Sequence, residues 1–144
     1  MAEILIVDDD DVIRDTLYEL LSERYQCQTA ETADAALAQL RSGLIEVVLT
    51  DISMPGLSGL DLLNQILKGY PNTPVIIISG ISDQEHAEGL IRLGAFDYLL
   101  KPFRLEVVEN SVKRALEFRR GSLNGRQSKP ANATTNTDWK IVSE

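Results

Sequence analysis

Five short apolar runs alternate along the chain with longer segments in which apolar residues recur every three or four positions. The short runs predict β-strands over residues 3–7, 25–30, 46–50, 75–78 and 96–100. The longer segments predict α-helices over residues 11–23, 33–41, 59–68, 83–93 and 104–120. This alternation indicates an α/β fold in which a five-stranded parallel sheet is covered by helices on both faces.

Local signals support these boundaries. Asp10 or Asp11 is expected to cap the first helix, because a carboxylate accepts hydrogen bonds from the unpaired amides of a first helical turn. Thr32 is expected to cap the second helix, and Gly43 to end it. The apolar positions that we expect to face the core from the first helix are Val12, Ile13, Leu17, Leu20 and Leu21.

The composition changes at Gly121. Polar and small residues then dominate until Trp139. We therefore expect a folded domain over residues 1–120, followed by a flexible polar tail or linker over residues 121–144. Whether this tail is a natural end or the start of a longer linker stays open from the sequence.

Charge and cysteine content narrow the classes of function. The formal net charge is -8, and the tail carries a net +1, which leaves -9 for residues 1–120. Direct binding of nucleic acid by this region is therefore not expected. The single cysteine, Cys27, excludes an intrachain disulfide, and we expect a buried structural thiol. No apolar run reaches the length of a membrane span and no signal peptide is visible, so a cytoplasmic location is expected.

The polar residues of most interest follow the predicted strands. Asp8 and Asp9 follow the first strand, Asp51 the third, Ser79 the fourth and Lys101 the fifth. The carboxyl ends of parallel strands meet at one edge of a sheet, so these five side chains are expected to converge.

Electrostatics then indicates what this edge binds. Two carboxylates about 5 Å apart repel by roughly 3 kcal/mol at an effective dielectric of about 20. Three carboxylates together favour a bound cation, and a set of oxygen ligands without His or Cys favours Mg²⁺ over zinc. Asp51 is expected to act as a nucleophile towards phosphorus, Asp9 to bind the metal directly and Asp8 to bind it through water. Ser79 and Lys101 are expected to hold the phosphoryl group.

These residues resemble those of the receiver domain of two-component response regulators, a CheY-like family with a flavodoxin-like fold. The resemblance covers residues 3–120 and is carried by residues 6–10, 49–55, 78–80 and 94–103. It implies the strand order 2-1-3-4-5. It also implies transfer of a phosphoryl group to Asp51 from a sensor histidine kinase or a histidine phosphotransfer protein. Mg²⁺ would be held by Asp9, Asp51 and the backbone carbonyl of Ser53.

The resemblance further implies a conformational switch. Ser79 would move towards the phosphoryl group and Tyr98 would turn inward, which changes the face formed by the fourth helix, the fifth strand and the fifth helix. That face would signal to an output domain or a downstream protein. The Lys101–Pro102 bond matches a position that is usually cis in the family.

The same resemblance bears on catalysis and assembly. The domain would catalyse no turnover of an external substrate, only its own phosphorylation from a phosphodonor and slow autodephosphorylation. The resemblance also allows a dimer that forms on phosphorylation. However, Ser111 stands where regulators that dimerise through this face usually carry a basic residue, so Asp97 lacks its expected partner there.

Two other functions fit the sequence less well. A Mg²⁺-dependent phosphatase would use a second Asp two residues after its nucleophile, and Ser53 occupies that position here. A degenerate receiver that serves only as an interaction module is disfavoured because all five site residues are present. His86, the only histidine, is expected to be an exposed side chain of the fourth helix.

Overall fold

The computed structural model describes residues 1–52, 59–80 and 84–123. Strands and helices alternate throughout, as the sequence predicts. Their bounds are β1 Glu3–Val7, α1 Asp11–Leu21, β2 Gln26–Ala30, α2 Ala33–Leu40, β3 Val47–Asp51, α3 Gly59–Gly69, β4 Val75–Ser79, α4 Gln84–Leu93, β5 Asp97–Leu100 and α5 Leu105–Leu123.

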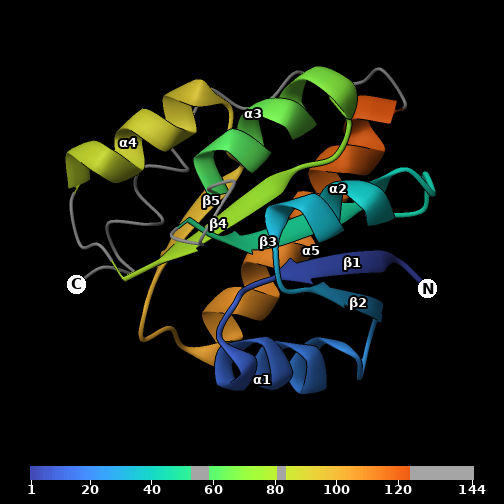
Figure 1. Cartoon of the computed structure of the whole chain (residues 1–144), viewed down its shortest axis with the longest axis vertical. Helices are drawn as coiled ribbons and strands as arrows, with labels where there is room; N and C mark the ends of the chain where they lie inside the picture. Colours follow the sequence, from blue (N-terminus) through green and yellow to red (C-terminus); the bar gives the residue numbers. More distant parts are fainter. Residues whose placement is uncertain (53–58, 81–83, 124–144) are drawn as a thin grey trace.

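All five strands form one parallel sheet in the order β2-β1-β3-β4-β5 (Figure 1). This confirms the predicted fold class and strand order. The register brings the strand ends level with one another: Val7 pairs with Thr50, Asp51 with Ile78 and Ser79 with Leu100. The residues that follow these strands therefore emerge along a single edge of the sheet.

Helices cover both faces of the sheet (Figure 1). Helices α1 and α5 lie on one face, over a core that includes Leu17 of α1, Ile76 of β4 and Val112 of α5. Helices α2, α3 and α4 lie on the other, over a second core that includes Leu40, Leu63 and Ile77. Because successive strand residues point to opposite faces, the unbroken apolar run of β4 supplies both cores.

The ends of the helices follow from local hydrogen bonds. Asp10, rather than Asp11, caps α1: its carboxylate accepts from the amides of Val12 at 2.9 Å and Ile13 at 3.3 Å. Helix α5 continues three residues past the expected boundary at 120. Its last turns are attached to the loop before β4, because Arg119 Nη1 donates to the carbonyl of Asn72 at 2.9 Å. The division of the chain into a domain and a tail at residue 120 stays a prediction.

Among the residues of the first helix that were expected to face the core, the prediction for Val12 is wrong. Val12 is 74% exposed, whereas Leu17 and Leu21 on the same helix are almost fully buried. Consecutive helical residues are rotated by about 100°, so Val12 lies outside the stripe shared by Ile13, Leu17 and Leu21. The fifth helix has a second such error, since its first residue, Leu105, was expected to face inward and is 43% exposed. None of the helices in the described part of the chain is long and apolar enough to cross a bilayer.

The turn between α4 and β5 depends on Gly94. Its φ is +124°, and a Cβ atom there would lie 2.8 Å from Cδ2 of Leu67 on α3. Other residues rarely adopt this backbone conformation, and the contact is closer than real Cβ atoms tolerate. Gly89, in the middle of α4, has neither constraint, since nothing lies within 4 Å of the position that a Cβ atom would take there.

These two glycines give a matched pair of substitutions. Gly94→Ala is expected to lower the free energy of unfolding by about 1–3 kcal/mol through backbone strain and overpacking against Leu67. Gly89→Ala is expected to raise it by about 0.5–1 kcal/mol, because alanine is the better helix former. Urea unfolding followed by circular dichroism measures both. Equal effects of the two substitutions would contradict this account of the turn.

Candidate functional site

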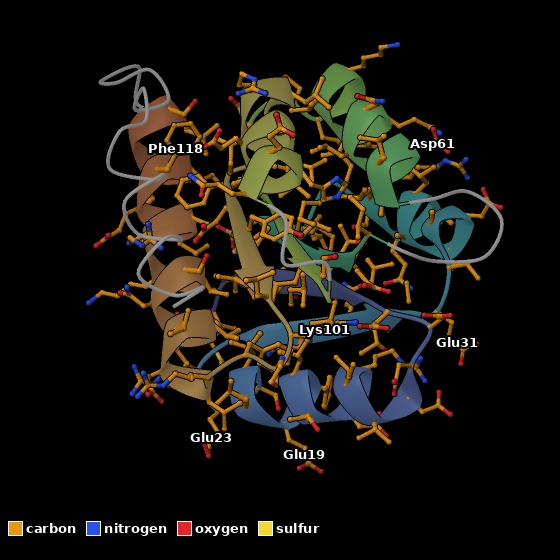
Figure 2. All side chains as sticks on the ribbon, turned by 90° about the vertical axis from the view of Figure 1, so that its left-hand side faces the viewer. Glu19, Glu23, Glu31, Asp61, Lys101 and Phe118 are labelled. Atoms are coloured by element: carbon orange, nitrogen blue, oxygen red, sulfur yellow. The ribbon has the colours of Figure 1, made fainter. Side chains whose placement is uncertain are left out.

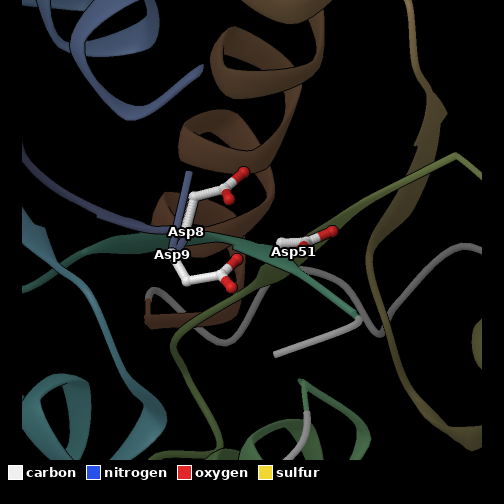
Figure 3. Close-up of side chains that lie close together, drawn as sticks. All are labelled: Asp8, Asp9 and Asp51. Carbon is white, nitrogen blue, oxygen red and sulfur yellow. The ribbon is translucent and has the colours of Figure 1, made fainter. Parts of the chain in front are cut away.

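Three carboxylates gather where β1 and β3 end. One oxygen atom from each of Asp8, Asp9 and Asp51 lies within 4.8 Å of the other two, and Figure 3 shows the three side chains close together. Asp8 is 1% exposed and Asp51 is 6% exposed, whereas Asp9 is open to solvent. The expected convergence of these three residues is therefore present.

Lys101 completes the cluster from the end of β5. Its Nζ donates to Oδ1 of Asp51 at 3.1 Å and to Oδ2 of Asp8 at 3.5 Å. The carboxyl edge of the sheet lies on the left of Figure 1 and faces the viewer in Figure 2. Lys101 is labelled near the centre of that second view. The bond between Lys101 and Pro102 is cis, as the resemblance implies.

Burial and charge act together on these groups. Burial raises the pKa of Asp8, although a hydrogen bond from the amide of Asp10 and the charge of Lys101 act against that rise. Burial alone would lower the pKa of Lys101, but its hydrogen bond to Asp51 and the charges of Asp8 and Asp51 outweigh burial and raise it. Lys101 is therefore positively charged at neutral pH. One ammonium thus faces three carboxyl groups.

This donor set fits Mg²⁺. The ion binds through oxygen and keeps several waters, so it needs only a few carboxylates close together. The three carboxylates meet that need without a His or Cys. The carbonyl of Ser53, the remaining predicted ligand, lies outside the described residues.

The two predicted switch residues occupy neighbouring strands. Ser79 is the last residue of β4 and is 1% exposed; its carbonyl accepts from the amide of Lys101 at 2.8 Å. Tyr98 is also 1% exposed, and its ring meets that of His86 edge-on, with 6.0 Å between centroids. The prediction that His86 is exposed is wrong, since the residue is half-buried. Its polar sequence neighbours concealed the fact that this position of α4 faces β5.

Asp97 has partners that the sequence did not reveal. It is 1% exposed and accepts from Oγ of Ser111 at 2.6 Å and from Nη2 of Arg114 at 2.9 Å. Arg114 lies one helical turn after Ser111, on the same side of α5. The basic partner of Asp97 is thus supplied within the chain, one turn beyond the position where it was sought.

Comparison with known proteins agrees with this arrangement. A family model described as response regulator receiver domain matches residues 4–113. The DNA-binding transcriptional regulator NtrC of Salmonella typhimurium is 42% identical over 114 residues, which are 78% of this chain and 24% of that protein. The nitrogen assimilation regulatory protein NtrX of Azorhizobium caulinodans is 38% identical over 118 residues, 80% of this chain and 26% of that protein.

Solved structures give the same result. The receiver domain of NtrX from Brucella abortus superposes with a TM-score of 0.75 at 42% identity, over 79% of this chain and 98% of that one. A receiver domain from Clostridium thermocellum superposes with a TM-score of 0.79 at 32% identity, over 83% of this chain and 98% of that one. The chain thus spans about a quarter of the curated regulators and nearly the whole of the isolated receiver domains. With its CheY-like sheet and its carboxylate and lysine cluster, the chain belongs to the response regulator receiver domain family.

Proposed function

We propose that this chain is a phosphoacceptor domain that receives a phosphoryl group on Asp51 from a sensor histidine kinase or a histidine phosphotransfer protein. The observation that carries the proposal is the position of Lys101 Nζ, 3.1 Å from the Asp51 carboxylate at the edge where Asp8 and Asp9 also gather. A lysine and a cation site beside one carboxylate are what in-line transfer to that carboxylate requires.

The transfer uses residues at or just beyond the carboxyl ends of four strands. Lys101 holds one oxygen of Asp51, which orients the carboxylate for attack by its other oxygen. A bond forms between that oxygen and phosphorus while the bond from phosphorus to the donor histidine nitrogen breaks. Lys101 and the hydroxyl of Ser79 then stabilise the phosphoryl oxygens. Mg²⁺ would be held by Asp9 and Asp51, with Asp8 reaching it through water, and would neutralise phosphoryl charge.

The same geometry supports a switch. The predicted inward position of Tyr98 is already occupied in this structure, where its ring is buried against His86 of α4. Movement of Ser79 towards the phosphoryl group would therefore change the packing beside β5 and so act on this contact with α4. Helix α4 buries only Ala87 and Leu90, whereas α5 buries six residues. The helix with fewer apolar contacts shifts more readily, so phosphorylation would change the population of α4 positions.

We place the chain within a larger regulator. The NtrC relatives are named DNA-binding transcriptional regulators, so we propose that the phosphorylated receiver controls a separate output domain or downstream protein in the cytoplasm. The negative charge of residues 1–120 makes direct DNA binding by the receiver itself unfavourable. Any phosphorylation-dependent dimer would rely on contacts other than Asp97, because that carboxylate is buried against Ser111 and Arg114.

The proposed acceptor, Asp51, can be tested by labelling. After incubation with acetyl phosphate and Mg²⁺, the intact wild-type chain should gain the mass of one phosphoryl group, and a chelator should prevent the gain. Asp51→Asn removes the nucleophile and should show no gain. Asp34→Asn, an exposed substitution in α2, is the matched control and should be labelled like the wild type. Labelling of Asp51→Asn to the same stoichiometry would rule out Asp51 as the acceptor.

The clustered carboxylates should also carry a measurable cost in stability. The pKa of Asp8 is raised in the folded state, so its ionisation destabilises the fold; this penalty is absent at low pH and grows as pH rises through the folded-state pKa. Asp8→Asn removes the charge and keeps an oxygen that can accept from the amide of Asp10. Without Mg²⁺ at pH 7 it should therefore raise the free energy of unfolding by about 0.5–2 kcal/mol.

Urea unfolding in chelator at pH 7 and near pH 4 measures this effect. The gain should shrink at the lower pH, because a larger fraction of Asp8 is then protonated in the folded wild type. Asp34→Asn should change the free energy of unfolding by less than about 0.5 kcal/mol at either pH. A loss of stability in Asp8→Asn at pH 7 would show instead that the ion pair with Lys101 outweighs the burial of the charge.

A further inference from the structure

Arg14 of α1 lies directly behind the loop that carries Asp8 and Asp9. Its side chain is only 11% exposed. Nη1 donates to the carbonyl oxygen of Asp8 at 2.9 Å, while Nη2 binds the carboxylate of Asp11 and lies 3.5 Å from that of Glu31. One guanidinium thus joins the end of β1, the first turn of α1 and the residue after β2. In Figure 2, Glu31 lies at the right-hand margin of the molecule, above the level of α1.

The contact at Asp8 has a consequence for the cation site. The amide of Asp8 donates to the carbonyl of Ala30 at 3.1 Å, and its side chain binds the amide of Asp10 at 2.9 Å and Lys101 at 3.5 Å. Arg14 holds the carbonyl of the same residue. That carbonyl belongs to the peptide that joins Asp8 to Asp9. The orientation of this peptide therefore sets the position from which the exposed side chain of Asp9 extends.

We propose that Arg14 is a positioning residue for the Mg²⁺ site: it holds the Asp8–Asp9 peptide so that both carboxylates face the ion. This rests on the proposed function, in which these carboxylates bind Mg²⁺. The guanidinium suits the task because its planar fork donates to a carbonyl with one nitrogen and to carboxylates with the other. A lysine in its place has a single nitrogen and cannot reproduce both arms in that geometry.

Charge and position make opposite predictions for this residue. A positive charge near a cation site disfavours the cation, so removing Arg14 should tighten Mg²⁺ binding if charge alone mattered. Removing a contact that positions a metal ligand should instead weaken Mg²⁺ binding, commonly by about 10- to 100-fold. The sign of the change therefore separates the two roles.

The experiment measures the Mg²⁺ dissociation constant of the full chain by calorimetric titration in the wild type, Arg14→Gln, Arg14→Lys and Arg24→Gln. Arg24 is exposed at the end of the loop after α1, so Arg24→Gln makes the same change of charge away from the site. We expect binding about tenfold or more weaker in Arg14→Gln, at least about threefold weaker in Arg14→Lys and within about twofold of wild type in Arg24→Gln. Thermal unfolding in chelator checks that each variant is folded.

A second readout needs no metal. Amide hydrogen exchange at Asp9 and Asp10 should be faster in Arg14→Gln than in Arg24→Gln, because the peptide before Asp9 has lost its anchor. If Arg14→Gln fails to fold, the exchange rates of the same two amides in Arg14→Lys are compared with those in Arg24→Gln instead.

The outcomes are separable. Unchanged or tighter Mg²⁺ binding in Arg14→Gln, in a wild type that binds Mg²⁺, would overturn the positioning role. If Arg14→Lys binds Mg²⁺ as tightly as the wild type, the claim that the task needs the two-armed guanidinium is overturned. A folded wild type that binds no Mg²⁺ at millimolar concentration would overturn the proposed function itself, and the inference with it.

Discussion

The structure is organised around an unequal balance of charge at one edge of its sheet. Asp8 and Asp51 are buried there, Asp9 stands beside them, and Lys101 supplies one positive charge to the group. Carboxylates this close together repel one another unless a cation joins them. Two apolar cores, one on each face of the sheet, hold the strand ends in register and so keep these charges together. The repulsion between the carboxylates costs free energy, and the burial of the two cores offsets that cost.

The elements that would carry a signal away from this edge are attached with different strength. Strand β5 is bound to α5 through Asp97, Ser111 and Arg114, and the end of α5 is held by Asn72. Helix α4 has a smaller apolar contact, and His86 meets Tyr98 at its inner side. A change at Ser79 would therefore be absorbed by α4 rather than by the joined pair of β5 and α5.

The apolar runs and their periodicity are enough to predict the strands and the meeting of Asp8, Asp9, Asp51 and Lys101, and the family resemblance adds the strand order. The meeting of these side chains is predictable because strand-end residues of a parallel sheet must share an edge. Val12 is misplaced by the pattern because it lies one residue outside a narrow apolar stripe. The contacts of Arg14, His86 and Arg114 depend on which helix face meets which strand, and their polar surroundings give no sign of burial. The role of Ser53 stays a prediction.

The most direct test of the central claim is a crystal structure of the chain with Mg²⁺ and fluoroberyllate, a mimic of a phosphoryl group. The charge balance predicts Mg²⁺ bound by oxygens of Asp9 and Asp51 at about 2.0–2.1 Å, with the fluoroberyllate on Asp51. Lys101 should then move from Asp8 towards a fluorine atom. Fluoroberyllate on another side chain, or carboxylates still gathered around Lys101 with no ion among them, would contradict the account.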